Sequence, residues 1–148
     1  EEAWDFGIDL LLTSLTRTIR AALPHLRQAA AGRIVNISST EGVGGSANIS
    51  AYTAAKHGVI GLTRSLAVEL GESGITVNAV CPGPIHTGIT SAIPEEMKAK
   101  FARRTVPVRR YGEPEEIAHG ILHLALPASS YITGHALLVD GGMTIKNN

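Results

Sequence analysis

A tyrosine and a lysine stand four residues apart in the segment Tyr52-Thr53-Ala54-Ala55-Lys56. On a helix, side chains at positions i and i+4 lie on the same face, so the phenol and the ammonium can share one site. A free tyrosine titrates near pH ~10, and a fixed cation beside such a group favours its phenolate form. A tyrosine in this setting can act as a general acid or base. The spacing therefore predicts an acid–base pair, although a Tyr/Lys pair on a helix is by itself more often structural.

Ser39 adds a hydroxyl upstream of this pair. It ends the apolar run of residues 33–39, which is typical of a buried strand. A hydroxyl at the end of a strand, facing the start of a helix, is well placed to hold a substrate carbonyl. The order Ser39, Tyr52, Lys56 therefore favours a catalytic site over a structural pair.

With further segments, these residues resemble the short-chain dehydrogenase/reductase family, whose active-site signature is a serine followed by Tyr-x-x-x-Lys. The matching segments, in the family's order, are IVNISS (34–39), AYTAAK (51–56), GLTRSLA (61–67), VNAVCPGPI (77–85) and DGG (140–142). The resemblance covers nearly the whole chain and is closest in general look to the 3-oxoacyl-[acyl-carrier-protein] reductase-like branch. It implies the C-terminal portion of a Rossmann-like doubly wound parallel sheet with helices on both faces.

The resemblance also implies a reaction and a role for each catalytic residue. The reaction is hydride transfer between a nicotinamide cofactor, NADP or NAD, and a small carbonyl compound or secondary alcohol. Tyr52 would exchange a proton with the substrate oxygen, and Lys56 would assist it and bind the nicotinamide ribose. Ser39 would hold the substrate carbonyl and stabilise the charge that develops on it. Members of such a family are expected to be cytoplasmic homo-oligomers, either dimers or tetramers.

The cofactor site that the resemblance implies includes Tyr52, Lys56 and four residues from the loop that follows the second expected strand. Pro82 and Gly83 would shape the loop beside the nicotinamide. The backbone of Ile85 and the hydroxyl of Thr87 would bind its carboxamide or the phosphates, with an ordinary loop hydroxyl as the alternative for Thr87. Asn78 is expected to fix the edge of the sheet rather than to touch substrate.

Two features depart from the family pattern. A dinucleotide fingerprint needs a glycine-rich turn between a first strand and a helix, with an acidic residue ~20 positions later. The glycines of residues 42–45 instead lie between the Ser39 strand and the Tyr52 helix. Residues 1–148 are therefore expected to form a single partial domain, the catalytic half without its nucleotide-binding half.

In the register set by Trp4 and Pro24, Leu11 replaces an asparagine of the family's proton relay and cannot form its hydrogen bonds. A non-catalytic remnant, or a structural or oligomerisation module without cofactor binding, is the alternative function.

The apolar periodicity predicts alternating helices and strands, hence a parallel sheet between two helical layers. A helix starts near Trp4 and is kinked or ended by Pro24, and another begins at Pro114. A long helix over 50–73 is stopped by Gly74. The other expected elements are strands 33–39, 75–80 and 135–139 and a short helix over 94–104.

The composition excludes several classes of protein. With 44% hydrophobic residues and 13 basic against 13 acidic residues, the chain has no signature of disorder or of nucleic-acid binding. It has no run of about 18 apolar residues, so no membrane span is expected. The single cysteine, Cys81, is interpreted as a core residue, which fits a reducing compartment.

His119 and His123 share a helix face without a third ligand, so no metal site is predicted. The arginines of residues 103–110 are interpreted as solvated surface, with docking of an acidic carrier protein as the alternative.

Overall fold

The computed structural model, which describes residues 1–146, contains a parallel sheet of three strands. The strands are β1 (Arg33–Ile37), β2 (Thr76–Pro82) and β3 (Ala136–Val139), and they lie in this order across the sheet. Ile34 of β1 is in register with Val77 of β2, and Val80 of β2 with Leu137 of β3. Helices connect successive strands, as parallel pairing requires. The predicted α/β class is confirmed.

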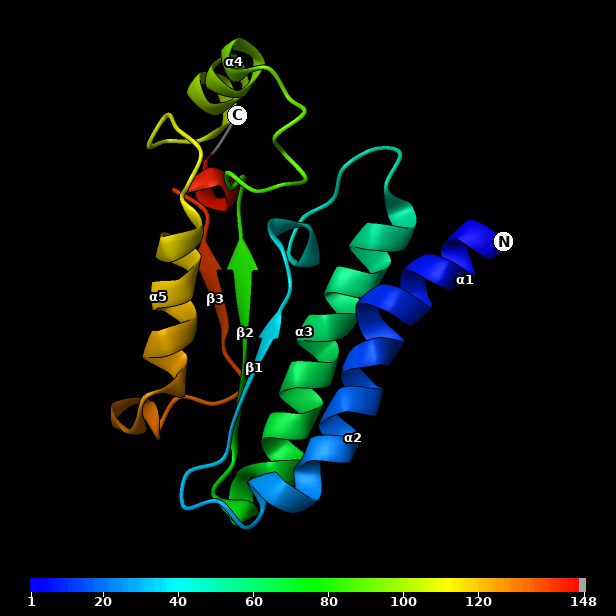
Figure 1. Ribbon diagram of the computed structural model, residues 1–148, viewed down its shortest axis with the longest axis vertical. Coiled ribbons are helices and arrows are strands. Elements are labelled where there is room, and N and C mark those ends of the chain that lie inside the picture. The colour runs from blue at the N-terminus through cyan, green and yellow to red at the C-terminus, as the bar shows by residue number, and fades with distance from the viewer. Residues whose placement is uncertain (147–148) are drawn as a thin grey trace.

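Helices cover both faces of the sheet (Figure 1). On one face lie α1 (Glu2–Ile8), α2 (Ser14–Leu26) and α3 (Ser50–Leu70). On the other face lies α5 (Pro114–Ala125), which contacts all three strands. The short α4 (Glu95–Thr105) stands beyond the carboxyl ends of the strands. The two predicted helical layers are therefore present, and the strands' carboxyl ends open between them.

The first two helices are continuous with each other through a π-helical turn. This turn spans Asp9–Thr13, so Leu11 lies in its centre. Pro24 lies inside α2, which continues to Leu26, so the prediction that this proline ends the helix is wrong, whereas a kink there stays a prediction. Its missing N–H removes one hydrogen bond in the final helical turn, where the rest of the helix tolerates the loss. Trp4 is 45% exposed, and the buried stripe begins further on, at Leu15 and Ile19.

The strands β1 and β2 differ in burial. The first six residues of β2 are all buried, from Thr76 to Cys81, because it has a strand on each side and helices on both faces. In β1, Val35 is half-buried and Ile37 is 41% exposed, because within residues 1–146 it pairs only with β2. The prediction of a buried strand over 33–39 is therefore wrong in two respects. The strand ends at Ile37, and its outer side is open.

The long helix α3 positions the predicted tyrosine and lysine. It ends at Leu70 rather than at residue 73, since a 3₁₀ turn over Gly71–Ser73 follows it. Gly74 then adopts a φ of +71°, as expected for the glycine that stops a helix. The inner face of α3 packs on β2 through Val59, Leu70 and neighbouring small residues.

No helix within the described residues is both long enough and apolar enough to span a membrane.

Candidate active site

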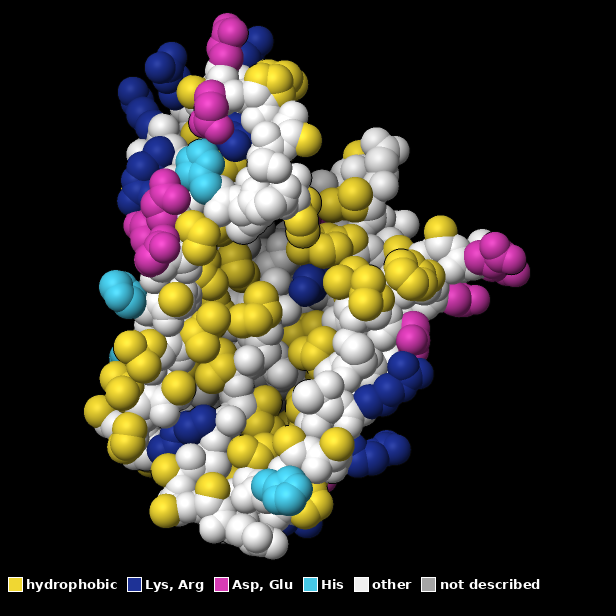
Figure 2. Space-filling model, in the orientation of Figure 1, with side chains coloured by type: hydrophobic (Ala, Val, Ile, Leu, Met, Phe, Trp, Pro, Cys, Tyr) yellow, Lys and Arg dark blue, Asp and Glu magenta, His cyan; other side chains and the backbone are white. Residues whose placement is uncertain are grey.

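A pocket of about 460 Å³ opens at the carboxyl ends of β1 and β2. Hydrophobic side chains gather in the hollow between α5 and the layer of α1, α2 and α3 (Figure 2). In open α/β sheets, ligands bind at this end of the strands. The pocket lining includes every residue predicted for the site: Ser39, Tyr52, Lys56, Pro82, Gly83, Ile85 and Thr87.

Lys56 is held between the end of β1 and the ring of Tyr52. Its Nζ donates a hydrogen bond to the carbonyl oxygen of Ile37 at 3.0 Å and lies 5.6 Å from the centroid of the Tyr52 ring. The residue is only 9% exposed. Burial lowers the pKa of this ammonium below that of an ordinary lysine, and the neighbouring Cys81 offsets part of the effect. The arrangement places a desolvated cation beside the phenol.

Ser38 holds the same lysine from its backbone side. Its buried hydroxyl donates to the carbonyl oxygen of Lys56 at 2.9 Å, and its own N–H donates to Val80 of β2 at 2.8 Å. The end of β1 is thereby joined to both α3 and β2. Ser38 was not identified from the sequence. The tandem Ser38-Ser39 was a possible signal, since adjacent residues in extended backbone point to opposite sides and two serines can therefore serve two different contacts.

Ser39 begins the 3₁₀ turn Thr40–Gly42 and retains a free donor. Its Oγ accepts a hydrogen bond from the N–H of Glu41 at 3.1 Å, which leaves the hydroxyl proton available for another acceptor. Gly42 packs so closely that a Cβ there would lie 2.8 Å from the Lys56 carbonyl oxygen. The serine and the lysine are therefore fixed through one compact junction.

The opposite wall is the loop that leaves β2. A Cβ on Gly83 would lie 2.8 Å from Cα of Asp140, so this glycine permits the loop to rest on the turn after β3. Ile85 pairs with Gly112 in an isolated bridge, and its carbonyl oxygen accepts the Thr90 hydroxyl at 2.9 Å. The same hydroxyl accepts the N–H of Thr87 at 2.9 Å. The loop is thus ordered by its own hydrogen bonds.

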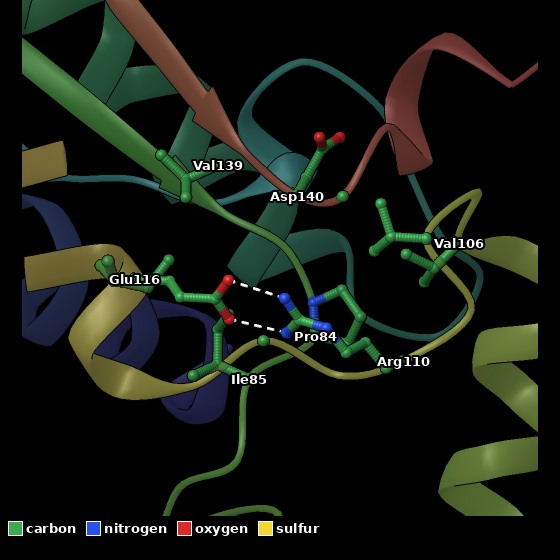
Figure 3. A pocket seen from close by; sticks show the side chains of 11 residues that line it. Pro84, Ile85, Val106, Arg110, Glu116, Val139 and Asp140 are labelled. Carbon is green, nitrogen blue, oxygen red and sulfur yellow. Dashed lines mark hydrogen bonds and ion pairs between the residues drawn. The ribbon is translucent and has the colours of Figure 1, made fainter. Parts of the chain in front are cut away.

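A second, smaller pocket of about 120 Å³ adjoins this wall and shares Pro84, Ile85 and Ile117 with the first. In Figure 3 the side chains of Arg110 and Glu116 point toward one another across it. Their two hydrogen bonds measure 2.7 and 2.8 Å. The Arg110 guanidinium and the N–H of Glu113 lower the pKa of Glu116 to about 2. Within the predicted basic patch, Arg110 is therefore neutralised by a carboxylate.

Asp140 organises the turn that follows β3. One carboxylate oxygen accepts the N–H of Gly142, and the other accepts the N–H and hydroxyl of Thr144, all within 2.9 Å. Burial raises the pKa of Asp140, but these hydrogen bonds outweigh it and the pKa falls below its usual value. Figure 3 shows the carboxylate pointing away from Arg110, so it holds the turn rather than the ion pair.

The remaining candidates lie outside the pocket lining. Asn78 is fully buried in the central strand, where its side chain donates to the carbonyl of Ile132 and accepts the N–H of His135, so it anchors the segment before β3. Cys81 is a core residue, and burial raises the pKa of its thiol. Leu11 is half-buried and does not line the pocket. Within residues 1–146, no three His, Cys, Asp or Glu side chains are grouped as metal ligands.

Comparison with known proteins gives relatives over the whole fold. Residues 1–144 match a family model described as enoyl-(acyl carrier protein) reductase. The chain is 45% identical to cis-4-hydroxycyclohexanecarboxylate dehydrogenase of Sinomonas cyclohexanicum, with 96% of this chain and 57% of that protein covered. It is 43% identical to 3-oxoacyl-[acyl-carrier-protein] reductase of Vibrio cholerae, with 97% and 58% covered. The chain thus spans less than two thirds of the length of these relatives.

Solved structures are similar in fold. The ligand-free aldohexose dehydrogenase of Thermoplasma acidophilum superposes with a TM-score of 0.93 at 33% identity, covering 99% of this chain and 61% of that chain. An NADPH-bound short chain oxidoreductase of Pseudomonas aeruginosa, described as containing an atypical catalytic center, gives 0.91 at 34% identity, covering 99% and 59%. With its Ser39, Tyr52 and Lys56 on one pocket and relatives along its length, the chain belongs to the short-chain dehydrogenase/reductase family, in its 3-oxoacyl-[acyl-carrier-protein] reductase-like branch.

Proposed function

We propose that this chain carries the catalytic part of an NAD(P)-dependent oxidoreductase that interconverts a carbonyl compound and a secondary alcohol. The observation that supports this most is the junction of Ser39, Tyr52 and Lys56 on one pocket, with the lysine ammonium buried beside the tyrosine ring. The names of the relatives, a dehydrogenase and a reductase, support the same type of reaction.

In reduction, Tyr52 would donate its phenolic proton to the substrate oxygen as that oxygen gains charge. Ser39 would donate its free hydroxyl proton as a hydrogen bond to the same oxygen, which stabilises the developing negative charge. Lys56 would stabilise the tyrosinate left behind, and its bond to Ile37 keeps the ammonium aimed at this place. In oxidation, the proton would pass from the alcohol to Tyr52.

The pocket fits the nicotinamide end of the cofactor. Once bound, the cofactor supplies or accepts the hydride, so that ketone, NAD(P)H and a proton balance alcohol and NAD(P)⁺. Residues 82–87 form an ordered wall for the ring, and Lys56 is the cation available to the ribose. No glycine-rich phosphate turn between a first strand and a helix occurs in the described part of the chain, so the fit concerns this end alone. Two solved relatives contain NADP or NADPH, and we propose NADP or NAD as the cofactor of the whole protein.

The proposed substrate class is small carbonyl compounds and secondary alcohols. The family model and the relatives are named for different reactions on different substrates, from acyl chains on a carrier protein to a hydroxylated cyclohexane carboxylate. A cytoplasmic homodimer or homotetramer is the accompanying prediction for the whole protein.

A second function is favoured by Leu11. Leucine in the π-helical turn cannot complete a hydrogen-bonded proton relay, which favours a non-catalytic structural or oligomerisation module. The two proposals differ in one measurable respect, because only the enzyme consumes NADPH or NADH in the presence of a ketone.

The test is the substitution Tyr52→Phe in the full-length protein that carries this chain. We expect the rate of ketone reduction, followed by nicotinamide absorbance over a panel of ketones, to fall by about 100-fold or more, because the proton donor is removed. Tyr131→Phe is the matched control, since this tyrosine is fully exposed, and it should retain the wild-type rate. Residual activity of the Tyr52→Phe protein within tenfold of wild type would place the proton donor elsewhere. A wild-type protein that turns over no ketone would favour the structural module.

A further inference from the structure

Glu41 joins three parts of the site without lining the pocket. It lies in the 3₁₀ turn Thr40–Gly42, and its N–H donates to the hydroxyl of Ser39 at 3.1 Å. One carboxylate oxygen accepts the hydroxyl of Ser46 at 2.7 Å. The other accepts the hydroxyl of Thr53 at 3.1 Å. Its partners thus come from the end of β1, from the glycine-rich loop and from the first turn of α3.

We propose that Glu41 is a positioning residue that fixes Tyr52 relative to Ser39. Thr53 follows Tyr52 directly in the helix, so a restraint on Thr53 restrains the backbone that carries the phenol. The backbone N–H of Glu41 also donates to the hydroxyl of Ser39. Glu41 therefore spans the interval between the two groups that must meet one substrate oxygen. The proposal rests on the proposed function of this site.

The loop between these anchors needs such a restraint. Residues 43–49 contain Gly44 and Gly45, form no helix or strand, and place Asn48 at a φ of +68°. Glycine pairs leave a backbone with many accessible conformations. The bond from Ser46 to Glu41 divides this loop and holds its middle against the 3₁₀ turn. Without that bond, the start of α3 would depend on packing further along the helix.

The contacts of the carboxylate are all hydrogen bonds. Among the described residues, no lysine, arginine or histidine forms a salt bridge with Glu41. Two hydroxyl donors therefore satisfy its two oxygens, and Ser46 and Thr53 occupy different oxygens. Hydrogen bonds to a charged acceptor are stronger than those between neutral groups, so each contributes to holding its own segment. An amide of the same shape keeps one acceptor oxygen, and its NH₂ group can donate to the other hydroxyl, so glutamine should preserve much of the effect, whereas a methyl group will not.

The experiment compares Glu41→Ala, Glu41→Gln and Thr53→Val in the full-length protein. For Glu41→Ala we expect kcat to fall about tenfold or more, because small displacements of a catalytic group are costly, while KM for the cofactor stays within about twofold. Glu41→Gln should recover most of the rate. Thr53→Val should lower kcat, and its effect should vanish in the Glu41→Ala background. Glu72→Ala, in the exposed turn at the far end of α3, is the matched carboxylate control.

Hydrogen exchange gives a readout that is independent of turnover. In Glu41→Ala, the backbone amides of residues 43–53 should exchange faster than in wild type, and Glu72→Ala should leave them unchanged. If the wild-type protein reduces no ketone but Glu41→Ala still exchanges these amides faster than wild type, the restraint is supported and the proposed reaction is refuted. Unchanged exchange, a kcat within twofold of wild type, or a Glu41→Gln protein as impaired as Glu41→Ala would each overturn the assignment.

Discussion

The two walls of the pocket are held together by different kinds of contact. On the β1 side, Ser38, Gly42 and Lys56 meet in a buried junction, where the Ser38 hydroxyl donates to the carbonyl oxygen of Lys56 at 2.9 Å and Gly42 leaves no room for a side chain. On the opposite side, the bidentate pair of Arg110 and Glu116 is about half-exposed. The same site thus combines a rigid wall with a wall that is tied partly by surface charge.

This difference matches the proposed tasks of the two walls. The β1 side carries the groups that we propose exchange a proton, and such groups must keep a fixed spacing whatever the substrate. The other side carries the loop of residues 84–90, which continues toward α4 and whose surface is more exposed. A wall held by its own loop hydrogen bonds can change shape with less loss of core packing. We therefore expect substitutions on the β1 side to cost more stability than those on the other side.

The largest effect is expected for Gly42→Ala. The new Cβ would clash with Oγ of Ser38 and would lie 2.8 Å from the carbonyl oxygen of Lys56, so the backbones of the 3₁₀ turn and of α3 must move apart. Overpacking of this kind reduces the free energy of unfolding by about 1 to 3 kcal/mol, and the rigid surroundings favour the upper end. Urea unfolding of the full-length protein measures the change.

Gly61→Ala is the control for that substitution. Gly61 lies in the exposed face of α3 with no atom within 4 Å of the position of a Cβ. Alanine there should raise the free energy of unfolding by up to about 1 kcal/mol, because glycine is the poorer helix former. Equal losses for both substitutions would mean that the junction around Gly42 is no tighter than the helix surface.

An intermediate effect is expected for Asp140→Asn in the turn after β3. The amide can replace some of the acceptor sites for Gly142 and Thr144 but not the charge, so we expect a loss of about 1 to 2 kcal/mol at pH 7. The pKa of Asp140 is depressed in the folded protein. Its contribution is therefore full above the ordinary pKa and is lost as the pH falls through the folded value.

The pH dependence supplies the sharper test of this turn. The difference in urea midpoint between wild type and Asp140→Asn should shrink steadily below the ordinary aspartate pKa of 3.8. Asp5→Asn, on the exposed surface of α1, should show little change at any pH. A difference for Asp140→Asn that stays constant between pH 7 and pH 3 would show that the charge contributes nothing to the turn.

Much of the fold was predictable because its signals are local. Gly74 and Pro114 mark helix boundaries by the backbone conformations they permit, and both lie where expected. The convergence of Ser39, Tyr52 and residues 82–87 follows from parallel topology, since the carboxyl ends of neighbouring strands meet at one edge. Spacing alone predicted the pairing of Tyr52 with Lys56, whereas the place of residues 82–87 in the same site was implied by the resemblance to the family.

What the sequence did not reveal depends on contacts between distant segments. Ser38 and Glu41 carry no motif of their own, and their importance appears only once β1, the glycine-rich loop and α3 are side by side. The exposure of Ile37 depends on which strands flank β1, which its apolar composition does not encode. Pro24 does not end its helix, because it lies in the last turn, where the loss of one backbone hydrogen bond is tolerated.

The smallest effect is expected for Glu116→Gln, which keeps an acceptor for the N–H of Glu113 and removes the charge that faces Arg110. Since the pair is solvent-exposed, the shift in urea midpoint should be smaller than for Asp140→Asn and should decrease further in high salt. The pKa of Glu116 is about 2 in the folded protein, so its contribution is full above the ordinary value of 4.5 and is lost as the pH falls toward 2. A loss as large as that of Gly42→Ala, or one insensitive to salt, would mean that this wall is as rigid as the β1 side and would remove the contrast between them.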